Sequence, residues 1–164
     1  MAQEIERKFL VKGDSYQKLA FDHTRIVQGY IVSGGGRSVR VRIRGDRGFL
    51  TIKGASHDGG LSRYEFETEV SLADAQELMA LCEPGRVEKT RWLVRADDGH
   101  VFEVDEFHGD NDGLVMAELE LKNADEAFKK PDFIGTEVTG DRRFYNSHMR
   151  RYPFKLWCKD CPQP

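Results

Sequence analysis

The N-terminal stretch Glu4-Ile5-Glu6-Arg7-Lys8-Phe9-Leu10-Val11 alternates charged side chains with a mostly apolar set. A period of two is typical of a β-strand, because successive side chains point to opposite faces. Glu4, Glu6 and Lys8 therefore share one face, with neighbours roughly 6.5–7 Å apart. Carboxylates this close repel each other unless a cation or an oppositely charged strand lies between them. On one strand alone, the pattern fits a solvated face with salt bridges.

The same alternation recurs in five further segments, most of which carry a single sign of charge. Their polar positions are Arg40, Arg42 and Arg44; Thr51 and Lys53; Glu65, Glu67 and Glu69; Lys89 and Arg91; and Glu118 and Glu120. Exposed ion pairs contribute only about 0–1 kcal/mol each, so bulk solvent would not favour this sorting of charge. In one shared cavity, carboxylates can hold a hard divalent cation while Arg and Lys bind phosphate oxygens. The pattern therefore predicts a site for a metal–polyphosphate complex.

Composition limits the other options. A chain of 164 residues predicts one domain, and its net charge of −3 provides no global basic field for nucleic acid. No apolar run approaches the roughly 20 residues that span a bilayer. The N-terminus lacks a signal-peptide core, so we expect a cytoplasmic protein that binds neither nucleic acid nor membrane. The 3 cysteines are too few for a disulfide framework.

Turn signals divide the chain into about eight mostly antiparallel strands with few helices. Further strands are expected at residues 25–33, 86–96, 101–107 and 114–121. Helices are expected at residues 15–20, at 72–81 with Ser71 as N-cap, at 124–128 and at 147–152, and the chain from Pro131 is otherwise expected to be irregular.

A closed barrel of about eight strands can hold one small ligand. Here the charged faces would point inward, so the apolar faces would point outward and need cover from the 72–81 helix and the C-terminal segments. The sequence thus predicts a mainly β (α+β) fold: an eight-stranded antiparallel closed barrel with a charged interior. We expect this tunnel domain at residues 1–152 and a C-terminal tail at 153–164.

Nine blocks of the chain, in order, resemble the CYTH superfamily, also called the triphosphate tunnel metalloenzymes. The first is Glu4-x-Glu6-x-Lys8. The others are Gln28-Gly29-Tyr30, Arg40-x-Arg42, Thr51-Ile52-Lys53, Ser62-Arg63-x-Glu65-x-Glu67, Glu88-Lys89-Thr90-Arg91, Glu103-Val104-Asp105, Glu118-x-Glu120, and Asp141-x-Arg143-Phe144-x-Asn146. The resemblance covers about residues 3–150, and within the superfamily the chain looks most similar to the small bacterial tripolyphosphatases.

The resemblance implies a tunnel that binds a triphosphate together with Mg²⁺ or Mn²⁺. It implies metal binding by Glu4, Glu6, Glu118 and Glu120, with Glu65 and Glu67 as secondary ligands or water-orienting groups. It implies phosphate binding by Lys8, Arg40, Arg42, Lys53, Lys89, Arg91 and Arg143. Lys89, with Glu4 and Glu6, is a candidate catalytic residue that could position or activate water, although it could equally be a phosphate ligand. Asp105 is expected to orient a neighbouring cation, and Tyr30 to line the tunnel.

Several functions stay open. Metal-dependent hydrolysis of tripolyphosphate to pyrophosphate and phosphate is favoured by the short chain and the lack of an evident base-binding element. A class IV-type adenylate cyclase, making cyclic AMP and pyrophosphate from ATP, would need an adenine pocket, which His57, Phe107 or Trp157 could line. A thiamine or other organic triphosphatase is another alternative. A non-catalytic polyphosphate-binding module is disfavoured by the many carboxylates. Apolar strand faces indicate a possible homodimer.

Overall fold

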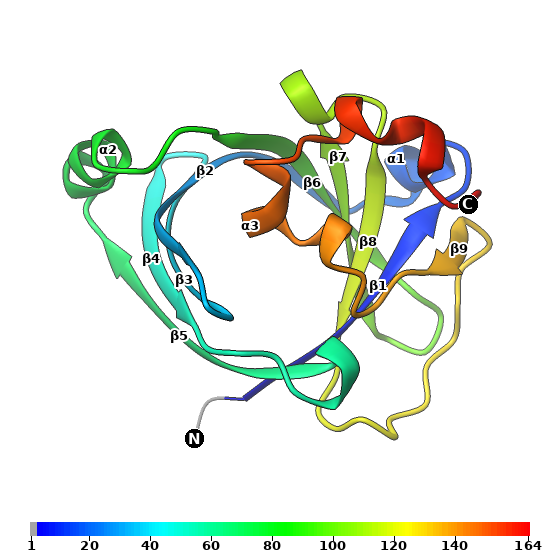
Figure 1. Ribbon diagram of the computed structural model, residues 1–164. Helices are drawn as coiled ribbons and strands as arrows, with labels where there is room; N and C mark the ends of the chain where they lie inside the picture. The colour runs from blue at the N-terminus through cyan, green and yellow to red at the C-terminus, as the bar shows by residue number, and fades with distance from the viewer. Residues whose placement is uncertain (1–2) are drawn as a thin grey trace.

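A computed structural model describes residues 3–164, and its strands form a closed antiparallel barrel (Figure 1). The strands are β1 (Gln3–Val11), β2 (Asp22–Gly34), β3 (Arg37–Arg44), β4 (Arg47–Lys53), β5 (Ser62–Val70), β6 (Val87–Arg95), β7 (Val101–Phe107), β8 (Val115–Glu120) and β9 (Ile134–Glu137). Their order is β5-β4-β3-β2-β6-β7-β8-β1, and β1 pairs with β5 to close the ring. The predicted eight-stranded barrel is therefore confirmed, with β9 added beside β1.

The helices are few and short. They are α1 (Ser15–Leu19), α2 (Leu72–Ala80) and α3 (Asn146–Met149), with 3₁₀ turns η1 (Asp58–Gly60), η2 (Gly109–Asn111), η3 (Arg142–Phe144), η4 (Phe154–Leu156) and η5 (Cys158–Asp160). Ser71 caps α2 as predicted, because its hydroxyl accepts a hydrogen bond from the backbone N–H of Asp74. Within residues 3–164, no helix combines the length and apolar character needed to cross a membrane.

Two sequence predictions outside the barrel are wrong. Residues 124–128 form no helix, because Asn123 and Glu126 bond locally instead: the Asn123 carboxamide accepts from the N–H of Asp125 and the Glu126 carboxylate from that of Lys122. Phe128 then packs on the buried Phe9. The region after Pro131, expected to be irregular, contributes β9, whose Ile134 pairs with Val11 of β1.

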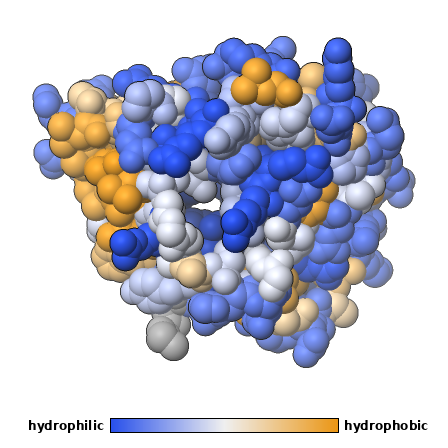
Figure 2. Space-filling model, viewed as in Figure 1, coloured by the Kyte–Doolittle hydropathy of each residue, from blue (hydrophilic) through white to orange (hydrophobic). Residues whose placement is uncertain are grey.

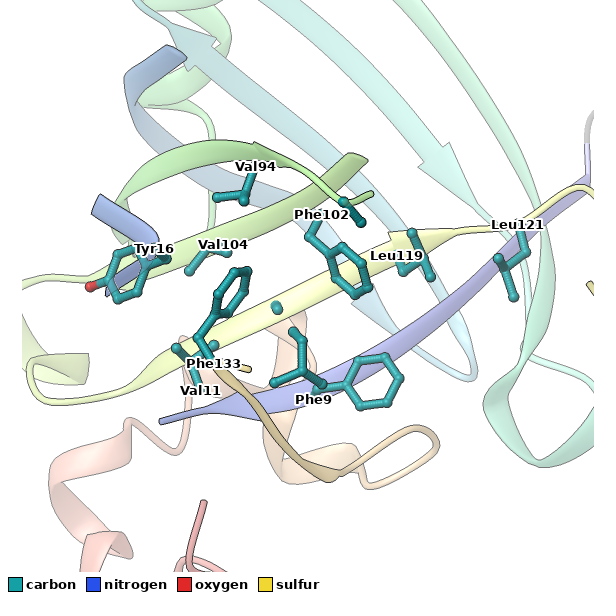
Figure 3. Close-up of a cluster of buried hydrophobic side chains, with 12 residues drawn as sticks. Phe9, Val11, Tyr16, Val94, Phe102, Val104, Leu119, Leu121 and Phe133 are labelled. Atoms are coloured by element: carbon teal, nitrogen blue, oxygen red, sulfur yellow. The ribbon is translucent and has the colours of Figure 1, made fainter. Parts of the chain in front are cut away.

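The barrel is inverted, as the alternation predicted. In β1, Glu4, Glu6 and Lys8 line the interior, whereas Phe9 and Val11 belong to a buried cluster on the outer face. Figure 3 shows this cluster, in which Tyr16 of α1 and Phe133 next to β9 cover the outer faces of β1 and β6–β8. Apolar burial stabilises the fold by about 25 cal/mol per Å², so an outward apolar face requires such covering segments.

Helix α2 covers a second part of the outer surface. Its Ala75 and Met79 pack on Val41 of β3. The approach is close because β4 has a glycine at the contact: a Cβ added to Gly48 would lie 2.4 Å from the Cβ of Ala75. Gly29 of β2 permits the same close packing beneath the helix.

The interior of the barrel changes character along its length. Leu10 and Met116 continue the inward faces of β1 and β8 beyond Lys8 and Glu118. With Phe107 they form an apolar cluster around Phe144 and Met149 of the C-terminal segment, which enters the barrel together with α3 (Figure 1). Phe154, Trp157 and Cys161 of the tail pack against this cluster. The interior is thus charged over one part of its length and apolar over the other.

Candidate active site

A cavity of about 350 Å³ occupies the charged part of the barrel. In Figure 2 the molecule is hollowed near the centre of the view, with hydrophilic residues above and to the right of the opening and residues of intermediate hydropathy to its left and below it. Every predicted site residue except Arg143 lines the cavity: Glu4, Glu6, Lys8, Arg40, Arg42, Lys53, Glu65, Glu67, Lys89, Arg91, Glu118 and Glu120. Residues from the whole chain therefore meet here because each lies on the inward face of its strand.

Arg143 does not line the cavity. Its guanidinium pairs with the carboxylate of Asp141 at 2.6 Å and lies over the ring of Trp157, 5.4 Å from its centroid. The Arg143 side chain thus lies on the C-terminal segment, where it links η3 to the tail through its contact with Trp157 and a hydrogen bond from Nη1 to the carbonyl oxygen of Asp160.

Further lining residues were not among the predicted ligands. They are Tyr30, Ser38, Arg44, Arg63, Glu103, Tyr145, Asn146 and Ser147. The expectation that Tyr30 lines the tunnel is confirmed. For Arg63 and Glu103 a signal existed, because they continue the inward alternation of β5 and β7. Tyr145 precedes α3 and Ser147 lies in it, so strand periodicity gives no signal for them.

The carboxylates of β1 are bound by cationic side chains of neighbouring strands. Glu4 accepts hydrogen bonds from Lys53 Nζ at 2.9 and 3.0 Å and from Arg63 Nε at 3.2 Å. Lys8 Nζ lies 3.3 Å from both Glu6 and Glu118. Burial opposes the charge on Lys8, yet these two carboxylates outweigh it and raise the pKa of the ammonium group. The alternating charges of different strands thus neutralise each other across the interior.

Asp105 is fully buried and holds two cations. It accepts hydrogen bonds from Arg91 Nε and Nη2, both at 2.7 Å, and from Lys89 Nζ at 2.5 Å. The predicted orienting role agrees with these contacts. Lys89 Nζ also donates to Asn146 Oδ1 at 3.1 Å. Burial lowers the pKa of Lys89 to about 7, with Arg91 acting in the same direction and Asp105 opposing it.

Two arginines of the cavity keep capacity for a further ligand: Arg42 forms no ion pair within residues 3–164, and Arg40 pairs only loosely with Glu67, at 3.5 Å. Burial, followed by repulsion from Arg40 and Arg91, lowers the pKa of Arg42. The Nε of Arg40 is buried and has no hydrogen-bond partner within residues 3–164. An unpaired buried donor costs about 1–3 kcal/mol, so this part of the cavity favours an anionic ligand that accepts hydrogen bonds.

Negative charge is left uncompensated around Glu120. Burial raises its pKa, and the carboxylates of Glu4, Glu103, Glu65 and Glu6 raise it further. Within residues 3–164, no three His, Cys, Asp or Glu side chains converge closely enough to form a ready coordination site. The oxygen donors around Glu120 nevertheless fit a hard divalent cation in charge and chemistry.

Counting charges gives the same conclusion. The cavity is lined by the cations Lys8, Arg40, Arg42, Arg44, Lys53, Arg63, Lys89 and Arg91 and by the acids Glu4, Glu6, Glu65, Glu67, Glu103, Glu118 and Glu120. Cations and acids nearly balance, so a bound polyphosphate would add several uncompensated negative charges. A divalent cation that enters with the phosphates would offset them.

Together, the inverted barrel and its interior define a class of protein that binds a phosphate polyanion inside a closed antiparallel β-barrel. The chain belongs to the CYTH family, since the CYTH domain model matches residues 2–145. The family resemblance of the sequence is therefore confirmed.

Named relatives cover nearly the whole chain. The chain is 47% identical to an inorganic triphosphatase of Acetivibrio thermocellus, over 94% of this chain and 97% of that protein. It is 36% identical to an inorganic triphosphatase of Nitrosomonas europaea, over 89% of this chain and 95% of that protein. The crystal structure of the inorganic triphosphatase NE1496 has a TM-score of 0.62 and 32% identity, covering 92% of this chain and 95% of that one.

Proposed function

We propose that this protein is a metal-dependent hydrolase that converts inorganic tripolyphosphate to pyrophosphate and phosphate. The observation that carries the proposal is the presence, in one cavity, of an arginine and a carboxylate that form no ion pair within residues 3–164: Arg42 among cations and Glu120 among carboxylates. Relatives at 47% and 36% identity named inorganic triphosphatase support it.

In this proposal the cations of the cavity hold the phosphates. Arg40, Arg42 and Arg91 would bind phosphate oxygens through paired N–H donors, and Lys8 and Lys53 as point charges. Glu4, Glu6, Glu118 and Glu120, with Glu65 and Glu67, would hold Mg²⁺ or Mn²⁺. When bound, the cation supplies charge neutralisation and orientation of the phosphate oxygens.

Lys89 is the proposed proton acceptor. The oxygen of a water molecule bonds to the terminal phosphorus in line with the leaving pyrophosphate, and the phosphoanhydride bond breaks. A pKa of about 7 leaves a large fraction of Lys89 neutral near neutral pH, so its Nζ can take the proton of the water. Asp105 and Asn146 hold that nitrogen in place through their hydrogen bonds.

The cyclase alternative has less support. Of the three residues considered for an adenine pocket, Phe107 is buried in the apolar part of the interior, and Trp157 packs edge-on against Phe144 and Phe154. Of the three, only His57 lines a cavity that adjoins the tunnel.

The test is product analysis with purified protein, Mg²⁺ or Mn²⁺, and tripolyphosphate or ATP. We expect orthophosphate and pyrophosphate from tripolyphosphate, lost in Glu4→Gln. Glu69→Gln is the matched control, because Glu69 is exposed on the same barrel, pairs with Arg47 and does not line the cavity. Cyclic AMP and pyrophosphate from ATP would establish the cyclase instead. Tight triphosphate binding without turnover would establish a binding module.

The remaining partners and the location stay predictions. We predict that the protein is cytoplasmic, that it binds neither nucleic acid nor membrane, and that it can form a homodimer. Tyr64 and Phe66 are each 45% exposed on the outer face of β5, so they are the positions at which charged substitutions would test dimer formation by light scattering.

A further inference from the structure

A buried amide of β2 lies between two groups of the proposed reaction. Gln28 is fully buried and lies directly opposite Arg42 of β3 in the strand register, whereas Lys89 belongs to β6 on the other side of β2. Arg42 Nε donates to Gln28 Oε1 at 3.1 Å, and Gln28 Nε2 donates to Asn146 Oδ1 at 3.1 Å. The same oxygen of Asn146 accepts from Lys89 Nζ at 3.1 Å. A chain of hydrogen bonds therefore joins the arginine to the lysine.

The direction of each hydrogen bond in this chain is fixed. A guanidinium group has N–H donors and no acceptor, so Gln28 must present its oxygen to Arg42. The NH₂ group of Gln28 then faces Asn146, and it also donates to the hydroxyl of Tyr30 at 3.3 Å. Because that NH₂ group only donates, Asn146 must offer its oxygen, and this is the atom that Lys89 contacts. Arg42 thus sets the orientation of the Asn146 carboxamide through Gln28.

The orientation of Asn146 decides what happens to the lone pair of neutral Lys89. A neutral amine has two N–H donors and one lone pair, and only the lone pair can take a proton. Within residues 3–164, the acceptors of Nζ are Asp105 Oδ2 at 2.5 Å and Asn146 Oδ1 at 3.1 Å. They use both N–H groups, so the lone pair is left for a water molecule in the cavity that Lys89 lines. If the Asn146 carboxamide were turned over, its NH₂ group would donate to the lone pair and block it.

The other groups around Nζ do not fix its orientation. Burial lowers the pKa of Lys89 most, and the charged groups that act on it are, in decreasing order, Asp105, Arg91, Glu118 and Arg42. Of these four, only Asp105 forms a hydrogen bond with Nζ among the described residues. The ring of Phe107, whose centroid lies 5.5 Å from Nζ, carries no polar atom. The direction of the lone pair therefore depends on Asp105 and Asn146.

We propose that Gln28 and Asn146 are positioning residues that keep the lone pair of Lys89 free for the attacking water. The inference rests on the proposed hydrolysis and assigns to Gln28 the control of Asn146. The water oxygen bonds to the terminal phosphorus while Nζ takes one of the water's protons, and neither amide gains or loses a proton. Because Gln28 also bonds to Arg42, the same chain ties the proton acceptor to a phosphate-binding group.

A double-mutant cycle between Gln28 and Asn146 tests the proposal. Gln28→Met keeps a side chain of similar length but removes its polar contacts, so the Asn146 carboxamide is free to turn over. On the alkaline plateau of the pH profile we expect kcat to fall about tenfold, a part of what a positioned general base contributes. In the Asn146→Asp background both terminal atoms at this position are oxygens, so Lys89 keeps an acceptor in either orientation. There Gln28→Met should change kcat by no more than about twofold.

Thr51→Val is the matched control, because Thr51 is also fully buried and bonds to the neighbouring arginine: Arg40 Nη2 donates to its hydroxyl at 3.1 Å. Its effect on kcat should be the same in both backgrounds, since its hydroxyl bonds to Arg40 and Glu67 and not to Asn146. An equal fall for Gln28→Met in both backgrounds would overturn the proposal, because Gln28 would then act through packing alone. If circular dichroism shows that Gln28→Met does not fold, Asn146→Ala decides: a plateau equal to that of the wild type rejects the positioning role, and a fall that Asn146→Asp does not share supports it.

A readout without turnover separates this inference from the proposed function. If the wild-type protein does not hydrolyse tripolyphosphate, the proposed function fails, and the titration of Lys89 Nζ by NMR, with ¹⁵N-labelled lysine side chains, still tests the contact. The oxygen of Asn146 favours the ammonium form, so its release in Gln28→Met should move the midpoint of this titration to lower pH. In the Asn146→Asp background, Gln28→Met should leave the midpoint where Asn146→Asp alone puts it. An equal shift in both backgrounds, or no shift in either, rejects the inference.

Discussion

Replacing Asp105 by asparagine tests how the interior charges hold the barrel together. The carboxylate is fully buried and accepts hydrogen bonds of 2.7 Å from two nitrogens of Arg91 and of 2.5 Å from Lys89. Asn keeps the shape but has no charge, and its amide NH₂ would face one of the two cations. Removing one partner of a buried ion pair costs about 3–5 kcal/mol, because the remaining charge loses its counter-ion. Arg91 would keep its pairs with Glu103 and Glu118, but both of these carboxylates are more exposed than Asp105. For a chain of this length, each kcal/mol lowers Tm by about 2–4 °C, so we expect a loss of roughly 6–20 °C.

Thermal unfolding followed by circular dichroism measures this loss. Glu103→Gln is the control, because Glu103 also pairs with Arg91 but its side chain is 32% exposed, and exposed pairs contribute about 0–1 kcal/mol. Arg91 and Lys89 hold the pKa of Asp105 below its ordinary value of 3.8 against the effect of burial. A lowered carboxyl pKa contributes stability above 3.8 that is lost as the pH falls through the folded value, so wild type and Asp105→Asn should converge only in acid. Equal Tm losses in the two variants at pH 7 would refute the reasoning.

The other predictions concern activity and packing. The kcat/KM of the wild type should fall as the pH drops through about 7, since protonation of Lys89 removes the proposed proton acceptor. If the residual activity of Lys89→Gln shows the same fall in kcat/KM near pH 7, the assignment of Lys89 is wrong. Glu120→Gln should raise Tm at pH 7, because it removes a carboxylate whose pKa is raised by burial and neighbouring carboxylates, and the gain should vanish as the pH falls through that raised pKa. The same variant should weaken Mg²⁺ or Mn²⁺ activation about 10–100-fold in titrations of the metal. Gly48→Ala should cost about 1–3 kcal/mol in urea unfolding through its clash with Ala75, while kcat/KM for tripolyphosphate stays unchanged.

The barrel and most of its interior could be predicted because strand alternation is a local signal. Once Glu4, Arg40 and Glu118 are each assigned to the charged face of a strand, closure of the sheet places them in one cavity without further information. That the apolar faces of the strands point outward also followed from the sequence. The helix at 72–81 has an apolar face, which needs an apolar sheet surface on the outside of the barrel to pack against.

The rest depended on contacts between distant segments. Residues 124–128 were expected to form a helix. The side chains of Asn123 and Glu126 instead accept hydrogen bonds from backbone N–H groups in a non-helical loop. The four residues of β9 carry no alternation and become a strand only because the edge of β1 is available. The apolar part of the interior could not be predicted either, because Phe144 and Met149 enter it from outside the strands, and neither strand alternation nor the expected helix at 147–152 indicates that this segment enters the barrel.

The seam between β1 and β5 couples ligand binding to the topology of the barrel. Among the described residues these strands pair over three positions, Gln3–Ile5 with Ser62–Tyr64, and Glu4 lies at the middle one. The cations that bind Glu4 belong to β4 and β5, on the other side of the seam. A ligand that engages groups from both sides opposes local opening there, and its binding free energy adds to the cost of detaching the N-terminal strand. Amide hydrogens along this seam should therefore exchange more slowly in the presence of substrate than in its absence.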